Sequence, residues 1–288
     1  MTLRTLMACA LLFGLGCAGN PSAPSYDGFA RPQWVTIRGY GGDAMEPFIT
    51  RDGRYLLFNN SNDPSVNTNL QYAERIDDLT FQYKGEITGT NSTSLDAVAT
   101  MDRAGNFYFI STRSYATTLS TVYRARFSNG TVSGVELVDG ISERRLGRVT
   151  FDVEVSPDGS TLYLSDGTFR GGSVPASADL AIAERQGTRF RRSERSGEIL
   201  RNINTAALEY AASISSNGQE LFFTRIRNMQ PAIYRATRSN LDVPFEPAAR
   251  ISAIDGFAEA PSLSPDERSL YYHKRESGRF VIARVTRR

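Results

Sequence analysis

The feature that most constrains this chain is a motif that occurs five times, at intervals of about 50 to 60 residues. Each copy is a polar turn followed by a short, apolar and often aromatic run. The turns are Thr50-Arg-Asp-Gly, Asp102-Arg-Ala-Gly, Ser156-Pro-Asp-Gly, Ser215-Ser-Asn-Gly and Ser264-Pro-Asp-Glu. Ser, Pro, Asp and Gly in this order suit a type I turn that joins two antiparallel strands. A motif with such a period predicts a repeat architecture.

Each repeat has room for four strands. The apolar run after the turn is too short and too aromatic for a helix, so it predicts a strand. A second apolar run follows each time, at residues 70–73, 122–125, 180–183, 233–236 and 281–283. A third follows in the first four repeats, at residues 80–83, 135–138, from 190, and 249–251. Together with the strand that enters the turn, these runs predict a four-stranded sheet per repeat, which is the blade of a β-propeller.

The Ser-Pro-Asp-Gly turn with flanking Leu and Tyr resembles the PD40 (WD40-like) repeats of the TolB propeller family. The resemblance covers residues 34–288 and is clearest at 156–164 and 264–272. The repeats at Asp102 and Ser215 lack the Pro, so their turns are free to differ. The resemblance implies a propeller fold and a role in protein interaction or maintenance of the cell envelope. TolB has a further N-terminal domain, whereas only residues 18–32 precede the propeller here, which puts a Tol-specific role in doubt.

The ends of the chain predict how the ring closes. The fifth repeat stops after its third strand, and residues 34–37 at the start of the body have no repeat of their own. Ile37 lies nine residues before Glu46, as Ile87 lies nine before Asp96. We therefore expect an all-β, five-bladed propeller over residues 33–288, whose N-terminal strand completes the last blade and removes an open edge.

The first 17 residues predict export. Arg4 is followed by an apolar stretch too short to span a membrane, then by Gly16 and Cys17. This resembles a bacterial lipoprotein signal, in which the cysteine becomes the lipidated first residue. With Ala18 next, the resemblance implies the outer membrane, on its periplasmic side. The alternative is an ordinary cleaved signal with an incidental cysteine. Residues 18–32, rich in Pro, Gly, Ser and Ala, read as a flexible tether.

Composition excludes several function classes. The net charge of +2, from 33 basic and 31 acidic residues, leaves no electrostatic footprint for nucleic acid. Both cysteines fall within residues 1–17, so the body holds no disulfide framework or cysteine-based zinc site. His273 is the one histidine, and without a partner motif we expect a structural role for it. Neither a Gly-x-Ser-x-Gly elbow nor a Gly-Lys-Ser/Thr phosphate loop is present. We expect no cofactor and a monomer.

Loop lengths predict which face binds a partner. The turns within each pair of hairpin strands are short, whereas the loops at the other end are long, for example residues 59–69 and 165–178. Functional residues usually lie on loops held by a rigid scaffold. This long-loop face carries polar amides together with exposed aromatic and basic candidates, which suit glycans or peptides. These candidates are Arg113, Tyr115, Phe169, Arg170, Arg225 and Arg227.

An acid precedes the first strand of every repeat. These acids are Glu46, Asp96, Asp152, Glu209 and Glu259. First strands line the channel of a propeller, so fivefold repetition predicts five carboxylates around one channel mouth. Three interpretations remain open: a structural ring bonded to backbone N–H groups, a calcium or cationic-ligand site, and an acid/base pair of a glycosidase. Repetition in every repeat favours the structural one, because a catalytic pair needs two distinct environments.

The sequence therefore leads to a non-enzymatic envelope lipoprotein, a propeller scaffold that binds a protein or glycan partner through its long-loop face. The alternative is a glycan-active enzyme, or a calcium site, that uses the channel-mouth carboxylates. Unlike environments for two of the acids favour the enzyme. Five acids bonded to the backbone favour the scaffold.

Overall fold

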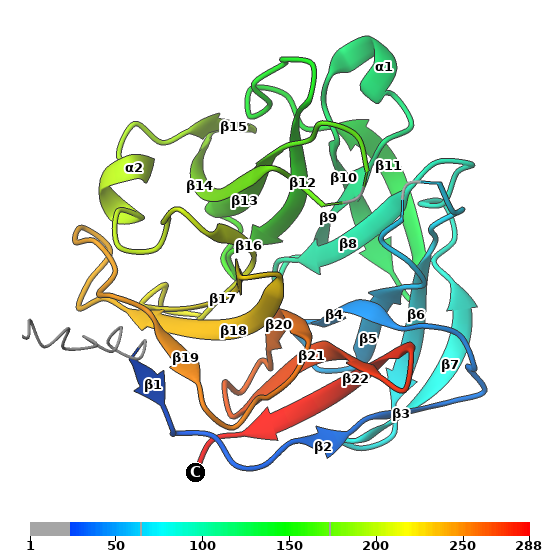
Figure 1. Cartoon of the computed structure of the whole chain (residues 1–288). Helices are drawn as coiled ribbons and strands as arrows, with labels where there is room; N and C mark the ends of the chain where they lie inside the picture. Colours follow the sequence, from blue (N-terminus) through cyan, green and yellow to red (C-terminus); the bar gives the residue numbers. More distant parts are fainter. Residues whose placement is uncertain (1–23, 64, 173) are drawn as a thin grey trace, which may run out of the picture.

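The chain folds almost entirely into strands. A computed structural model describes residues 24–63, 65–172 and 174–288. These residues form 22 strands in four sheets, together with the short helices α1 (Tyr115–Thr118) and α2 (Ser196–Ile199). The strands are arranged around a centre on which β4, β8, β12, β16 and β20 converge (Figure 1). The all-β class predicted from the repeats is confirmed.

Successive strands form antiparallel meanders that follow the predicted repeats, and we call them units 1 to 5. Unit 1 has β4 (Met45–Ile49), β5 (Tyr55–Asn59), β6 (Leu70–Arg75) and β7 (Thr80–Glu86). Unit 2 has β8 (Asp96–Met101), β9 (Asn106–Ser111), β10 (Val122–Ser128) and β11 (Thr131–Leu137). Unit 3 has β12 (Arg148–Val155), β13 (Thr161–Thr168), β14 (Ser177–Gln186) and β15 (Arg189–Arg192). Unit 4 has β16 (Leu208–Ile214), β17 (Glu220–Arg227), β18 (Gln230–Thr237) and β19 (Ala249–Ile251). Unit 5 has β20 (Ala258–Leu263), β21 (Ser269–Glu276) and β22 (Arg279–Thr286). Units 3 and 4 share one sheet, through the single pair Ala178 and Leu208.

All five repeat turns share one carbonyl bond, although the Asp102 turn closes one residue earlier, on Asn106. In the Ser156 turn, the N–H of Gly159 donates to the carbonyl of Ser156 (2.8 Å), and the Asp158 carboxylate accepts from the N–H of Ser160 (3.0 Å). The Asp102 and Ser215 turns, which lack Pro, make the corresponding carbonyl bonds from Gly105 and Gly218. The left-handed backbone at the fourth residue (φ +74° at Gly159) explains the glycine. In unit 5, Glu267 adopts this conformation.

The hydrophobic core lies between units and not within them. Each cluster of buried side chains combines residues of two neighbouring units, a contact that we call a seam. Phe58 and Phe81 of unit 1 pack with Tyr271 and Ile282 of unit 5, for example. The other four clusters join units 1 and 2, 2 and 3, 3 and 4, and 4 and 5. Because each fully buried large side chain contributes about 1.5–3 kcal/mol, every unit depends on both neighbours.

The N-terminal segment crosses three units. β1 (Ser25–Tyr26) pairs parallel with β19 of unit 4, and β2 (Gln33–Trp34) pairs antiparallel with β22 of unit 5. β3 (Thr36–Arg38) pairs parallel with β7 of unit 1. Residues 34–37 were predicted to complete the last unit only. Instead they divide between units 5 and 1, because the N–H of Val35 donates to Ile282 (3.0 Å) and that of Thr36 to Leu79 (2.7 Å).

The prediction of a flexible tether does not hold for residues 24–32. Besides the pairing of β1, Phe29 is fully buried in the core between units 4 and 5 and packs edge-on against Phe222 (6.0 Å between ring centroids). Burial of this aromatic ring, together with the pairing of β1 and β2, opposes the entropy cost of ordering the segment. Residues 1–23, with the predicted signal and Cys17, lie outside the described residues.

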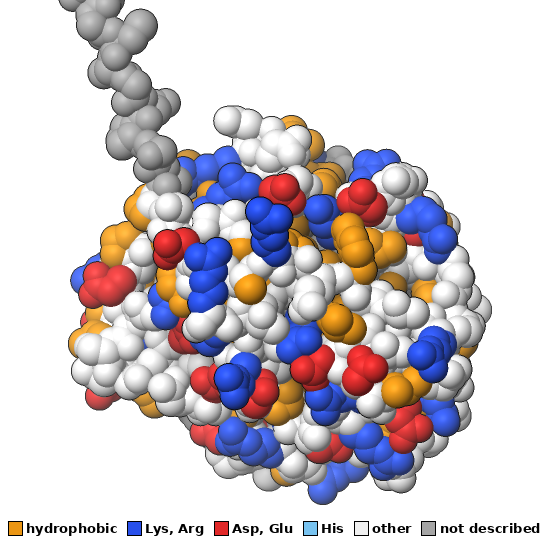
Figure 2. Space-filling model, turned by 90° about the horizontal axis from the view of Figure 1, so that it is seen from below, with side chains coloured by type: hydrophobic (Ala, Val, Ile, Leu, Met, Phe, Trp, Pro, Cys, Tyr) orange, Lys and Arg blue, Asp and Glu red, His pale blue; other side chains and the backbone are white. Residues whose placement is uncertain are grey.

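The face of the molecule seen from below carries charges of both signs without a single-sign field. Figure 2 shows Lys and Arg side chains interspersed with Asp and Glu over the face seen from below. This mixture agrees with the near-balanced net charge. No helix among the described residues has the length and hydropathy needed to cross a membrane.

Candidate functional site

The five acids do not form a fivefold ring. In units 1 and 3, Glu46 and Asp152 lie two residues before the first-strand residue that pairs with Leu57 or Tyr163. In units 2 and 4, Asp96 and Glu209 lie four residues before the corresponding first-strand residue, and in unit 5 Glu259 lies three residues before it. The sequence held this signal. Counted back from the first turn residue, the acids lie 4, 6, 4, 6 and 5 residues away. The acids are therefore not equivalent, because each first strand contains a bulge and the acids lie differently relative to it: Asp96, Glu209 and Glu259 before it, Glu46 within it and Asp152 after it.

Two of the acids are buried ion-pair partners. Glu209 is paired with Arg225 (2.6 Å) and also accepts from the hydroxyl of Thr205 (2.6 Å). Asp96 is paired with Arg113 (2.5 Å) in the same way. Arg225, predicted on the binding face, is buried and lies over the rings of Phe223 and Tyr234. Such pairs hold the scaffold together, because removing one partner leaves an uncompensated buried charge.

A series of side chains on the second strands joins neighbouring units. Each accepts a hydrogen bond from the backbone N–H of the bulge residue in the next unit. The pairs are Asn59 with Val98 (3.1 Å), Ser165 with Ala211 (3.1 Å), Thr224 with Ala260 (2.9 Å), and His273 with Glu46 (3.1 Å). All four acceptors are buried, so each bond satisfies a donor that water cannot reach. Sequence analysis missed this role, although a polar residue directly after each apolar run was the signal.

His273 therefore joins the last unit to the first. Its Nδ1 accepts the N–H of Glu46, so the ring proton lies on Nε2, which donates to Glu259 (3.0 Å). The other carboxylate oxygen of Glu259 accepts the hydroxyl of Tyr210. Burial and the charge of Glu259 hold the pKa of Tyr210 well above its usual value, so this hydroxyl stays protonated. The structural role expected for His273 agrees with this geometry, and Glu259 belongs to the same network.

The seam between units 2 and 3 departs from this series. Its second-strand residue is Ile110, which is buried and has no side-chain acceptor. In the next unit, Asp152 is 4% exposed and accepts a hydrogen bond from the backbone N–H of Val153. No side chain among the described residues donates a hydrogen bond or forms an ion pair with the Asp152 carboxyl. This buried carboxyl is thus without the partners that the other acids have.

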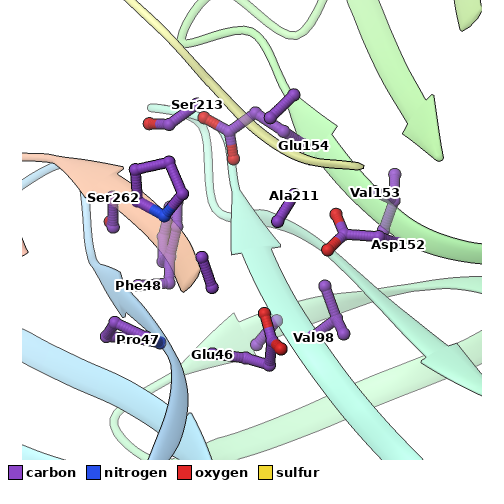
Figure 3. A pocket seen from close by; sticks show the side chains of 14 residues that line it. Glu46, Pro47, Phe48, Val98, Asp152, Val153, Glu154, Ala211, Ser213 and Ser262 are labelled. Carbon is purple, nitrogen blue, oxygen red and sulfur yellow. The ribbon is translucent and has the colours of Figure 1, made fainter. Parts of the chain in front are cut away.

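Asp152 and Glu46 line a narrow cavity at the centre of the molecule. Its volume is ≈ 30 Å³, which is room for about two water molecules. Figure 3 shows both carboxyl groups turned toward this space, with Ser213, Ser262 and Glu154 further along it. Glu46 accepts one bond from Asn62 (2.6 Å), whereas Glu154 is neutralised by Arg51 (2.7 Å).

Burial governs the protonation of the two carboxyls. Burial raises the pKa of Asp152 well above its usual value, and the charges of Glu46 and Glu154 raise it further. The pKa of Glu46 is raised by burial, with His273 acting against this and Glu259 adding to it. Two carboxyls in unlike environments at one cavity are able to hold a proton, to bind a cationic group, or to act as an acid/base pair.

No grouping of side chains in the described residues supports the predicted metal site. Within 24–63, 65–172 and 174–288, no three His, Cys, Asp or Glu side chains are grouped so that they are able to hold a metal ion. Asp96 and Glu209 are occupied by arginines. Calcium binding stays a prediction.

The remaining loop candidates lie in different environments. Arg170 and Arg227 are exposed. Phe169 packs edge-on against Phe151 (5.5 Å), and Phe151 in turn lies 5.6 Å from Tyr210. The hydroxyl of Tyr115 accepts the N–H of Gly147 (3.2 Å). Arg113 is three-quarters buried and engaged with Asp96. Phe169 thus connects with the central network, whereas Arg113 supports a loop.

Comparisons with known proteins show what the fold resembles, but they do not assign the chain to a family. No family model matches the chain, and no curated protein does. The solved family 117 glycoside hydrolase Zg3597 of the marine bacterium Zobellia galactanivorans is similar, with 12% identity, 90% of both chains covered and a TM-score of 0.60. The α-L-arabinofuranosidase PaAbf62A of Podospora anserina has 13% identity, coverage of 93% and 98%, and a TM-score of 0.55.

TolB of Acinetobacter baumannii also matches, with 17% identity over 82% of this chain and a TM-score of 0.43. The chain spans about half of that TolB, 52% of its length. At these identities the likeness concerns the fold alone. The fold is propeller-like.

Proposed function

We propose that this chain is a five-bladed β-propeller of the bacterial envelope that binds a ligand at the long-loop mouth of its central channel. Five seams, each with its own core, support five blades, and the pairing of β2 with β22 supports closure of the last blade. Lipidation at Cys17 and the periplasmic face of the outer membrane belong to the same proposal. A protein or a glycan is the expected partner.

One observation carries the binding function. The Asp152 carboxyl is buried, receives no hydrogen bond or ion pair from another side chain of the described residues, and is turned into the channel. Burial raises the pKa of this carboxyl, and the scaffold offers it only the backbone N–H of Val153 and no side-chain partner. A bound ligand supplies the missing partner.

The test is thermal melting of the full chain against a panel of neutral oligosaccharides and short basic peptides. We expect one class to raise the melting temperature of the wild type and not that of Asp152→Asn. Asp139→Asn is the matched control, because Asp139 is an exposed acid in a loop on the same face. If no probe shifts the wild type, or if every probe shifts wild type and Asp152→Asn equally, the binding function at this mouth is wrong.

A second candidate is glycoside hydrolysis. Glu46 and Asp152 meet at one cavity in unlike environments, which is the arrangement that an acid/base pair requires. Two similar structures with TM-scores above 0.5 are glycoside-acting enzymes by their titles. If this chain hydrolyses 4-nitrophenyl glycosides, Glu46→Gln and Asp152→Asn must each lower kcat by about 10²–10⁴-fold. Hydrolysis unaffected by both variants excludes this pair.

A further inference from the structure

The central cavity selects the chemistry of what enters it. We propose that the space between Glu46 and Asp152 receives a primary ammonium group of the ligand, such as a lysine side chain or an amino sugar nitrogen. This inference rests on the binding function proposed above and deepens it.

Charge is the first argument. The acids around the channel that serve the scaffold are neutralised by arginines, at 2.7 Å or less, in the pairs Glu154 with Arg51, Asp96 with Arg113 and Glu209 with Arg225. Within the described residues, neither Glu46 nor Asp152 has such a partner, and no Lys or Arg lines the cavity. The cavity thus offers two carboxyls and lacks the cation that the neighbouring acids possess. A ligand cation restores the balance.

Hydrogen-bond capacity is the second argument. An ammonium group has three donors and no acceptor. Between the two acids the cavity supplies the Asp152 carboxyl and the second oxygen of Glu46 as acceptors, and further along it the hydroxyls of Ser213 and Ser262. Each hydroxyl oxygen already accepts one backbone N–H, from Leu263 (3.0 Å) and Ile49 (3.2 Å), and keeps a further lone pair. The donors of an ammonium therefore match this lining.

Size is the third argument. A space of ≈ 30 Å³ holds about two water molecules, which is the size of an ammonium head. A planar guanidinium, with five donors in a fixed fork, and a sugar ring are both larger than this head. The rest of the ligand must therefore lie outside, over the mouth near Phe151, Phe169 and Tyr210.

Protonation couples to this binding. The groups that face Asp152 across the channel are Glu46 on β4, Glu154 on β12 itself and the Tyr210–Glu259–His273 network of β16, β20 and β21, with Arg51 behind Glu154. Burial among these groups favours a proton on the Asp152 carboxyl when no cation is present. Entry of the ammonium favours the carboxylate, so this proton is released to solvent. Binding must therefore strengthen as pH rises, until the amine itself loses its proton.

The test compares n-butylammonium chloride with n-butanol, a neutral probe of the same shape, by thermal melting and calorimetry on the full chain. We expect butylammonium alone to bind, more tightly at pH 8 than at pH 6, with proton release that is visible as a dependence of the heat on the buffer. Asp152→Asn must weaken it by about tenfold or more, since truncating a buried charge partner costs 2 kcal/mol or more. Asp139→Asn must leave it unchanged.

Several outcomes overturn the inference. Equal effects of butylammonium and butanol, or of butylammonium and potassium chloride at the same ionic strength, show that the ammonium group is not recognised. If a neutral oligosaccharide binds in an Asp152-dependent way and butylammonium does not, the ligand class is wrong while the proposed function stands. If no probe of either panel binds, both fail. Asp152→Glu, which keeps the charge but lengthens the side chain, checks that any loss comes from chemistry and not from unfolding.

Discussion

The seam between units 5 and 1 and the seam between units 2 and 3 occupy the same place in the repeat but have opposite character. At the first, His273 accepts the N–H of Glu46 and also donates to Glu259, so both ring nitrogens are engaged. At the second, Ile110 takes the place of the acceptor, and Asp152 faces the channel without a partner from another side chain. At most seams this position carries a hydrogen bond that joins two units. At one seam it carries none, and a carboxyl there is left available for binding.

The contrast between the two seams is tested most directly at His273. His273→Ala removes an acceptor and a donor from buried partners and leaves a cavity, so we expect a loss of about 3–5 kcal/mol in the free energy of unfolding. Urea denaturation measures it. His273→Asn is the matched variant, because Asn59 makes the same bond between units 1 and 2, and it must recover part of the loss. A variant His273→Ala as stable as the wild type contradicts the role of this residue in closing the ring.

A smaller effect is expected at the seam between units 4 and 5. Thr224→Val keeps the shape of the side chain but removes the oxygen that accepts the N–H of Ala260. One orphaned backbone donor costs about 1–3 kcal/mol. The same denaturation series measures it, with Thr117→Val at an exposed position as the control. A loss equal to that of His273→Ala would mean that the second bond of His273, to Glu259, adds nothing.

The smallest effect has the opposite sign, at the seam between units 2 and 3. Because the pKa of Asp152 is raised in the folded state, the folded protein binds this proton more tightly than the unfolded chain does. Its contribution to stability is present below the unfolded pKa near 4 and is lost as pH rises toward the folded value. The free energy of unfolding of Asp152→Asn must therefore equal that of the wild type at pH 4 and exceed it by about 1 kcal/mol or more at pH 8. A variant less stable than the wild type at pH 8 shows that the carboxylate has a partner, and Asp139→Asn controls for net charge.

Sequence reasoning succeeded where the physics is local. The Ser-Pro-Asp-Gly turns follow from the conformational preferences of four adjacent residues, and even the turns at Asp102 and Ser215 adopt the same carbonyl bond. The strands and the repeat follow from turn spacing and apolar runs. Inward-facing acids were found for the same reason, since each one precedes a strand.

It failed where partners are distant in sequence. The bulges that separate Asp96 from Asp152 in register depend on pairing with a second strand, and the arginines that occupy Asp96 and Glu209 lie 16 or 17 residues away. The bond from Glu46 to His273 spans 227 residues. Phe29 lies in a segment with the composition of a tether. It is buried only because units 4 and 5 form a pocket for it. None of these partners is visible in a window of sequence.

The N-terminal segment has a consequence for the order in which the molecule assembles. Ser25 and Tyr26 pair with Arg250 and Ile251, and Gln33 and Trp34 pair with Arg284 and Ala283, so the residues made first wait for those made last. Contacts of such separation form slowly, because the entropy of closing the loop must be met before they contribute. A ribosome or translocon that still holds residues 250–284 therefore keeps the ring open, because β1 and β2 have no strand to pair with until then.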